Sequence, residues 1–180
     1  VEYGGGIHAE ESTVNVNGGT IIGQSAKYGG GIYAYHSKIN ISGGQIIGNQ
    51  ATKGGGIHAT DRSTVSLKGG SISGNKSGQG SGVYLDMSNL FMMKEENGKS
   101  CQITQNTVTT EPSSTGMRGE GGGIFLIYSK AEIESGTINE NKAIAAAPDE
   151  YGNIRGGLGG AISAMYSNII IKGDAEIRNN

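Results

Sequence analysis

The chain has 180 residues, of which 34% are hydrophobic, and its formal net charge at pH 7 is −2. A charge so close to zero gives no general attraction to nucleic acid or to an anionic membrane surface, so neither is an expected partner. The longest apolar runs fall far short of the ~20 residues that a helix needs to cross a bilayer, so we expect no transmembrane segment in this chain.

Glycine is unusually frequent, with 34 residues, and many of these glycines belong to a motif that ends in an apolar residue. This apolar residue returns six times, at Ile7, Ile32, Ile57, Val83, Ile124 and Ile162. The first three intervals between these positions are 25, 25 and 26 residues. A fixed period of this length is typical of a protein built from stacked coils.

Each copy contains three short segments that are predicted to be strands. In the second copy these segments are residues 29–34, 37–41 and 46–49, where apolar and polar residues alternate between glycine turns. Stacked coils would bring the equivalent apolar residues into four inward rows. The rows are Ile7, Ile32, Ile57, Val83, Ile124, Ile162; Val14, Ile39, Val65, Leu90, Ala131, Ile169; Val16, Ile41, Leu67, Met92, Ile133, Ile171; and Ile21, Ile46, Ile72, Ile103, Ile138, Ile177. We therefore predict an all-β solenoid of about six coils of ~25 residues, with three short strands per coil.

Amide side chains form a further row, three residues after the last apolar row. Its members are Gln24, Asn49, Asn75, Asn106, Asn141 and Asn180. Asparagine tolerates left-handed backbone and can hydrogen-bond along a stack of itself, so we predict a structural role for this row. The single cysteine, Cys101, cannot form a disulfide within the chain and is expected to fill space in the core.

Residues 46–51, Ile-x-x-Asn-x-Ala, and the Gly-Gly-Ala-Ile of residues 159–162 resemble the repeats of bacterial polymorphic outer-membrane and autotransporter-type surface proteins. The resemblance covers nearly the whole chain outside its insertions. It implies a right-handed parallel β-helix, similar to pectate-lyase-like folds, on a cell surface and often in adhesion. Such folds serve adhesins, lyases and glycoside hydrolases alike, so the fold does not choose among these functions.

We expect residues 1–180 to form a single β-helix domain. The chain begins inside one copy of the motif and stops inside another, so we expect it to be part of a longer chain that carries further domains. The period lengthens after Val83, since the next two motif positions follow at intervals of 41 and 38 residues. The excess is assigned to insertions at residues 93–100, 107–119 and 142–157.

The last two insertions leave the coil just after the amide row and return just before the glycines. We therefore expect two loops that form a lip beside the face of the glycine motif. Loops on a rigid scaffold commonly carry binding residues, which makes Arg118, Asp149 and Arg155 candidate ligand-binding residues. The alternative is that these loops are tolerated surface decoration.

Aromatic side chains dominate the outward positions of the glycine-motif strands. The candidate ligand-binding residues there are Tyr33, Tyr35, His58, Tyr84 and Phe125. A flat strip of rings is suited to stacking on sugar rings or on peptide side chains. The alternative is that stacked rings stabilise the sheet by pairing with their neighbours.

Signals for catalysis are few. Asp61 and Asp86 lie on adjacent coils near one corner and are weak candidates for the paired carboxylates of a glycosidase. No metal or cofactor site is predicted, because His8 and His58 are two coils, roughly 9.6 Å, apart along the axis. We predict an extracellular or cell-surface protein that binds a glycan or a host-surface protein. Enzymatic activity is the less favoured prediction. A polysaccharide-active enzyme and a structural stalk remain the alternatives.

Overall fold

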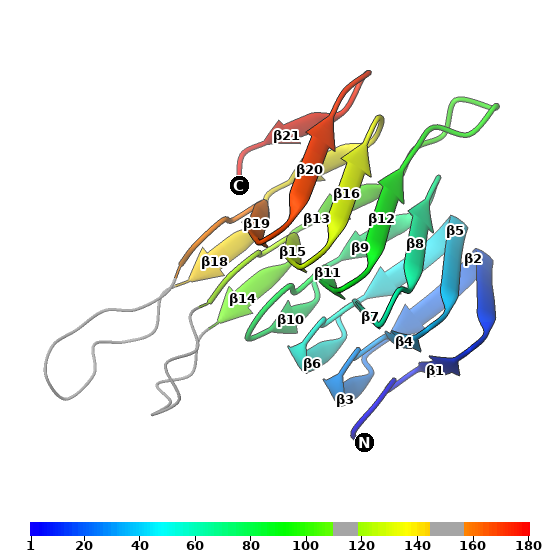
Figure 1. Ribbon diagram of the computed structural model, residues 1–180, viewed down its shortest axis with the longest axis vertical. Helices are drawn as coiled ribbons and strands as arrows, with labels where there is room; N and C mark the ends of the chain where they lie inside the picture. The colour runs from blue at the N-terminus through cyan, green and yellow to red at the C-terminus, as the bar shows by residue number, and fades with distance from the viewer. Residues whose placement is uncertain (110–118, 145–156) are drawn as a thin grey trace, which may run out of the picture.

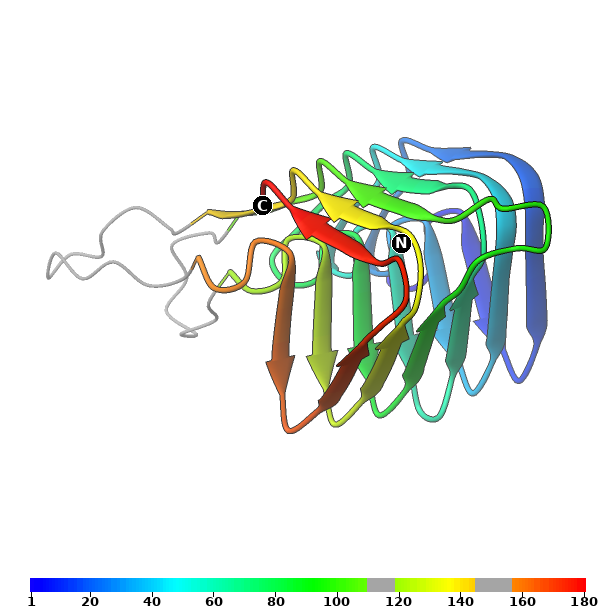
Figure 2. The same cartoon turned by 90° about the horizontal axis from the view of Figure 1, so that it is seen from above.

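In the computed structural model the chain is an all-β parallel solenoid, as predicted, and the structure describes residues 1–109, 119–144 and 157–180. These residues contain no helix, and all of their strand pairs are parallel. The coils follow one another in chain order along one axis, from the N-terminal coil at one end of the stack to the C-terminal coil at the other (Figures 1 and 2). No helix of the described part is long and apolar enough to cross a membrane.

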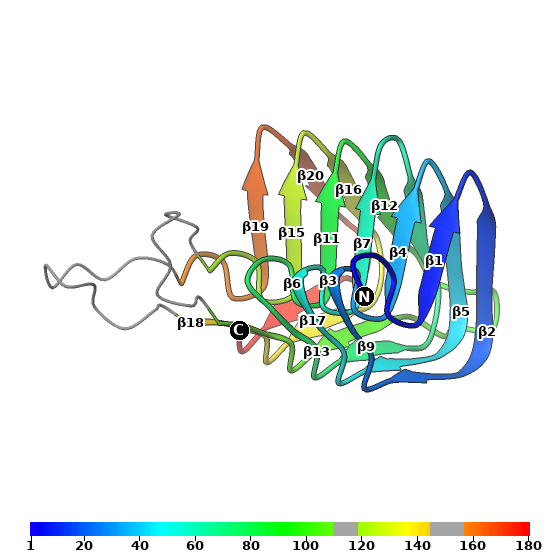
Figure 3. The same ribbon diagram turned by 90° about the horizontal axis from the view of Figure 1, so that it is seen from below.

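The front sheet consists of the strands that follow the glycine motif, and Figure 3 shows these strands side by side in chain order. The strands are β1 (Ile7–Glu10), β4 (Ile32–Tyr35), β7 (Ile57–Thr60), β11 (Val83–Asp86), β15 (Ile124–Ile127) and β19 (Ile162–Met165). Within each strand the first and third side chains point into the solenoid and the second and fourth point outward.

The second sheet is bent and forms two sides of the coil. In the first two coils one long strand covers both sides, and in later coils it is split by the turn between them. The strands are β2 (Thr13–Ile22), β5 (Lys38–Ile47), β8 (Thr64–Leu67), β12 (Asn89–Met92), β16 (Lys130–Ile133) and β20 (Asn168–Ile171), with β9 (Ser71–Ser73), β13 (Gln102–Thr104), β17 (Thr137–Asn139) and β21 (Glu176–Arg178) on the second side. The residues of the insertion at 93–100 lie between β12 and β13 and project beyond the coil (Figure 1).

A third sheet is made of short strands that follow the amide row. These strands are β3 (Ser25–Tyr28), β6 (Gln50–Lys53), β10 (Lys76–Ser77), β14 (Thr107–Thr109) and β18 (Lys142–Ile144). The sequence pattern did not predict this segment as a strand. The segment has only one small or apolar inward residue per coil, which is too few to show an alternating pattern. The first three residues of the insertions at 107–119 and 142–157 belong to this sheet, as β14 and β18.

The inward rows predicted from the sequence form the core. The strand register places Ile32, Ile57 and Val83 in consecutive coils, and Ile72 and Ile103 are partners in the same way. Side chains of the middle coils, such as Ile57 and Ile72, are 0% exposed. The core is therefore a stack of mostly β-branched residues that contact their equivalents in the coils above and below.

The amide row also has the predicted structural role. The side-chain amide of Asn49 donates to the side-chain oxygen of Asn75 over 3.0 Å, and that of Asn75 donates to Asn106 over 2.9 Å. Each amide makes a second bond to a backbone carbonyl of the preceding coil, as Asn75 does to Ile46 over 3.0 Å. Because Asn49, Asn75 and Asn106 are all 0% exposed, the row satisfies buried backbone groups at this corner.

Glycine is required where the third sheet passes into the front sheet. Gly29 has φ 65°, and a Cβ atom there would collide with the carbonyl oxygen of Ile32. A Cβ on Gly30 would collide with the backbone of Gly55 in the next coil. The repeated glycines thus allow a tight turn and the close stacking of successive turns.

Candidate functional site

The outward rings of the front sheet form a continuous stack, the aromatic column, whose members are His8, Tyr33, His58, Tyr84 and Phe125. The centroids of Tyr33 and His58 are 5.3 Å apart, those of His58 and Tyr84 4.6 Å, and those of Tyr84 and Phe125 5.2 Å. Strand register produces this stack, because the rings occupy equivalent positions of consecutive strands.

The expectation of an exposed strip is wrong for four of these rings. Tyr33, His58, Tyr84 and Phe125 are buried, with Phe125 only 1% exposed. Part of the cover comes from a neighbouring row where the third sheet ends and the turns to the front sheet begin. In this row the successive partners are Tyr3, Tyr28, Lys53, Gln79, Glu120 and Leu158. These buried rings therefore pack against neighbours instead of offering open faces to a ligand.

Contacts across the two rows show how the cover is built. The Tyr3 ring lies 4.7 Å from that of Tyr33, and the Tyr28 ring meets that of His58 edge-on at 5.4 Å. The ammonium group of Lys53 lies 5.2 Å from the centroid of the Tyr84 ring, within the range of a cation–π contact.

Burial changes the titration of the column. Desolvation raises the pKa of Tyr33 to about 12 and also raises the pKa of Tyr84. Desolvation lowers the pKa of His58 to about 3, against an opposing hydrogen bond to the Lys53 backbone. The Nδ1 atom of His58 has no hydrogen-bond partner among the described residues. His58 is therefore a neutral ring at physiological pH and packs as an aromatic residue.

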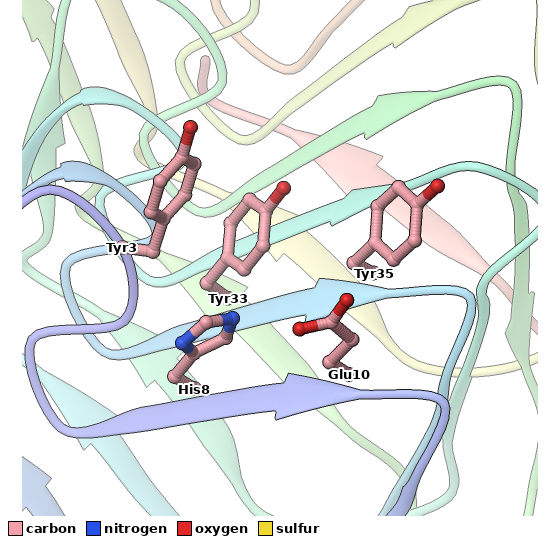
Figure 4. Close-up of a pocket in the computed structure, with 5 residues that line it drawn as sticks. All are labelled: Tyr3, His8, Glu10, Tyr33 and Tyr35. Carbon is pink, nitrogen blue, oxygen red and sulfur yellow. The ribbon is translucent and has the colours of Figure 1, made fainter.

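The column opens at its N-terminal end into a pocket of about 190 Å³. The pocket is lined by Tyr3, His8, Glu10, Tyr33 and Tyr35, and Figure 4 shows these side chains on one face of β1 and β4 and the turn before β1. Register pairs His8 with Tyr33 and Glu10 with Tyr35, so two rings and two polar groups face outward from adjacent strands. Tyr3 and Tyr35 are 39% and 38% exposed, and they leave aromatic surface open to solvent.

A polar cluster adjoins this pocket through Tyr35. The carboxylate of Asp61 lies 3.3 Å from Nδ1 of His36 and 3.6 Å from Nε of Arg62. The hydrogen bond with His36 is the largest cause that lowers the pKa of Asp61. A hydrogen bond with Tyr35 and the charge of Arg62 lower this pKa further. The charge of Asp61 in turn raises the pKa of Tyr35. Asp61 is thus held ionised beside the open ring.

Register does not place the two candidate catalytic carboxylates opposite each other. Asp86 is the strand partner of Thr60, whereas Asp61 lies at the following corner position. Burial raises the pKa of Asp86, while hydrogen bonds lower that of Asp61, so the two groups differ in environment. Their role in catalysis stays a prediction.

The predicted lip residues Arg118, Asp149 and Arg155 lie outside the described residues. Within the described part, no three His, Cys, Asp or Glu side chains are grouped so that they could hold a metal ion. Sequence reasoning placed Tyr33 and Tyr35 in the site but did not include Tyr3, His8 or Glu10. The positions of His8 and Glu10 in the outward rows were the available signal, whereas Tyr3 enters from the turn before the strand.

No family model, curated protein or solved structure matches the chain. The functional argument therefore depends on the residues themselves.

Proposed function

We propose that this chain is a non-enzymatic binding module of a secreted or cell-surface protein, and that it serves adhesion by binding a glycan at the open pocket. The observation that carries the proposal is the exposed Tyr35 ring beside Tyr33 and Glu10. Aromatic faces stack on the apolar faces of sugar rings, while a carboxylate accepts hydrogen bonds from sugar hydroxyls.

The rigidity of the scaffold supports this proposal. His8, Glu10, Tyr33 and Tyr35 project from paired strands of one sheet, so their spacing is set by the backbone ladder and little order is lost on binding. The Asp61 cluster adds fixed polar groups next to the Tyr35 ring. A pocket of this kind, open on one side, suits one or two residues of a longer glycan.

The proposed location rests on the resemblance of the repeats at residues 46–51 and 159–162 to those of autotransporter-type surface proteins. A parallel β-solenoid is the architecture that this resemblance implies, and the finer assignment to a pectate-lyase-like fold is part of the same proposal. The lip residues Arg118, Asp149 and Arg155 are proposed to extend the site, and a host-surface glycoprotein would be a suitable partner.

One observation favours the enzymatic alternative. The pKa values of Asp61 and Asp86 are moved in opposite directions, which is the pattern expected of a carboxylate pair that divides acid and base roles. The burial of the Tyr84 and Phe125 rings gives these two side chains a structural role, which is what the third alternative, a structural stalk, expects.

A glycan array followed by calorimetric titration of the best ligand tests the proposal. Tyr35→Ala should weaken binding about tenfold, a loss of about 1.4 kcal/mol, which is at the upper end of what ring stacking contributes. Tyr35→Phe keeps the ring and should retain most of the affinity. Tyr166→Ala, which removes an exposed tyrosine from the last coil, is the control.

Equal affinities of wild type, Tyr35→Ala and Tyr166→Ala would exclude the pocket as the glycan site. The same glycans should be incubated with the protein and assayed for new reducing ends. Cleavage that is lost in Asp61→Asn or Asp86→Asn would replace the binding proposal with the enzymatic one.

A further inference from the structure

Three tyrosine rings meet at the open pocket. The ring of Tyr3 lies 4.7 Å from that of Tyr33 with the planes at 56°, and Tyr35 follows Tyr33 on the same face of β4 (Figure 4). Tyr35 is 38% exposed although β4 lies between β1 and β7, so this exposure is not that of an edge strand. The pocket volume of about 190 Å³ is below the roughly 300–1,000 Å³ of sites for drug-sized ligands, so the pocket suits one small group.

A single carboxylate lies among these rings. Glu10 is the strand partner of Tyr35, and Figure 4 shows it on the same side of the sheet as the rings. Burial is the largest cause that raises the pKa of Tyr33, and the charge of Glu10 adds to it. The charge of Asp61 is the largest cause that raises the pKa of Tyr35, and Glu10 again adds to it. The negative charge of Glu10 therefore acts on both tyrosines of β4.

Basic side chains of the chain do not fill the pocket. Nζ of Lys27 lies 3.9 Å from the carboxylate of Glu2, and Nε of Arg62 lies 3.6 Å from that of Asp61. Lys38 begins β5 on the adjoining sheet and does not line the pocket. The five described residues that line the pocket include no Lys or Arg, and their carboxylate forms no ion pair with a described residue. This carboxylate is therefore available to a cation from outside.

The chain itself shows how an ammonium group sits on its rings. Nζ of Lys27 lies 5.1 Å from the centroid of the Tyr28 ring, and Nζ of Lys53 lies 5.2 Å from that of Tyr84. Both distances are within the ~6 Å range of cation–π contacts. In the row of turn residues, the position of Lys53 in the third coil is that of Tyr3 in the first. The pocket thus has the rings of such a contact without a lysine of the chain.

We infer that the open pocket binds a positively charged ammonium group, held over the tyrosine rings and paired with Glu10. This inference rests on the proposed function, because the glycan presents the group to the pocket. An amino sugar with a free amine and a glycan with a choline substituent both supply it. Either gives the ring faces a cation and the carboxylate a counter-charge, whereas a neutral sugar gives neither.

Ligand pairs that differ in charge test the inference. Choline and its uncharged isostere 3,3-dimethylbutan-1-ol are titrated at about pH 7, where amines carry a proton, as are oligomers of glucosamine and of N-acetylglucosamine. Choline should bind at least about tenfold more tightly than its isostere, and Tyr35→Leu, which keeps an apolar side chain without a ring, should reduce this preference. The tighter binder of choline and the glucosamine oligomer identifies the source of the ammonium group.

The carboxylate is tested with a matched pair of variants. Glu10→Gln should weaken choline binding about fivefold, the size expected for one exposed charge pair, and should leave binding of the isostere unchanged. Glu11→Gln removes the neighbouring carboxylate, which does not line the pocket, and is the control. Both glutamates are exposed, so the two variants should melt at the wild-type temperature.

The outcomes separate this inference from the proposed function. Equal affinities within each ligand pair, or equal effects of Glu10→Gln and Glu11→Gln, would overturn the inference. If a neutral glycan still binds and Tyr35→Ala weakens it, the proposed glycan site stands and only the ammonium group is excluded. If choline binds as expected and no glycan of the array does, the ammonium site stands and the glycan proposal fails.

Discussion

Replacing Asn106 with alanine removes the centre of the buried amide row. The side-chain oxygen of Asn106 accepts from the backbone N–H of Asn75 over 3.0 Å and from its side-chain amide over 2.9 Å. Its own amide donates to the carbonyl of Ile72 and to the side-chain oxygen of Asn141, both over 2.9 Å. Alanine makes none of these four bonds.

The cost follows from the groups that are left behind. The oxygen of Asn141 still accepts from the backbone N–H of residue 106 over 3.1 Å. The backbone N–H of Asn75, one of its amide hydrogens and the carbonyl of Ile72 lose their partners in a fully buried corner. A buried unpaired polar group costs about 1–3 kcal/mol, so three of them should lower the free energy of unfolding by at least about 3 kcal/mol.

Guanidinium unfolding followed by far-ultraviolet circular dichroism measures this loss. With an m-value of about 4 kcal/mol/M, the midpoint should fall by about 0.7 M. Asn89→Ala is the matched control, because Asn89 belongs to the same coil and its side chain makes no hydrogen bond within the described residues. Equal midpoints for Asn106→Ala and Asn89→Ala would refute the structural role of the row.

Two further predictions concern the aromatic column. Tyr84 and Phe125 are 3% and 1% exposed, so replacing both with alanine should lower the free energy of unfolding by about 3–5 kcal/mol for each ring. A melting temperature equal to that of Tyr128→Ala would contradict this prediction. His58 is neutral in the folded chain, with its pKa lowered from 6.5 to about 3, so the unfolded chain binds more protons between these pH values. Stability should therefore fall as the pH drops through this window, and His58→Phe should flatten this part of the pH dependence; identical slopes in urea titrations from pH 7 to 4 would refute the effect.

The sequence by itself determined the repeating elements. Ile32, Ile57 and Val83 could be assigned to one inward row, and Asn75 and Asn106 to one amide row, because a stacked coil needs the same kind of residue at each return of the chain. The repeat period in the sequence therefore predicts both the strand register and the core residues. The third sheet was not predicted, since its segments are short and mostly polar.

Only the tertiary structure decided which outward residues are accessible. Alternation along β11 places Tyr84 outside the sheet but does not say what lies above it, and the ring is covered in part by Lys53 from the end of β6. The same rule placed Tyr35 outward, and there the side chain stays 38% exposed. Pattern gives the direction of a side chain, whereas its burial depends on segments of other coils that the fold brings against it. The left-handed backbone of the corner residues Tyr128 and Tyr166 likewise emerges only from the structure, because no residue preference predicts tyrosine in this conformation.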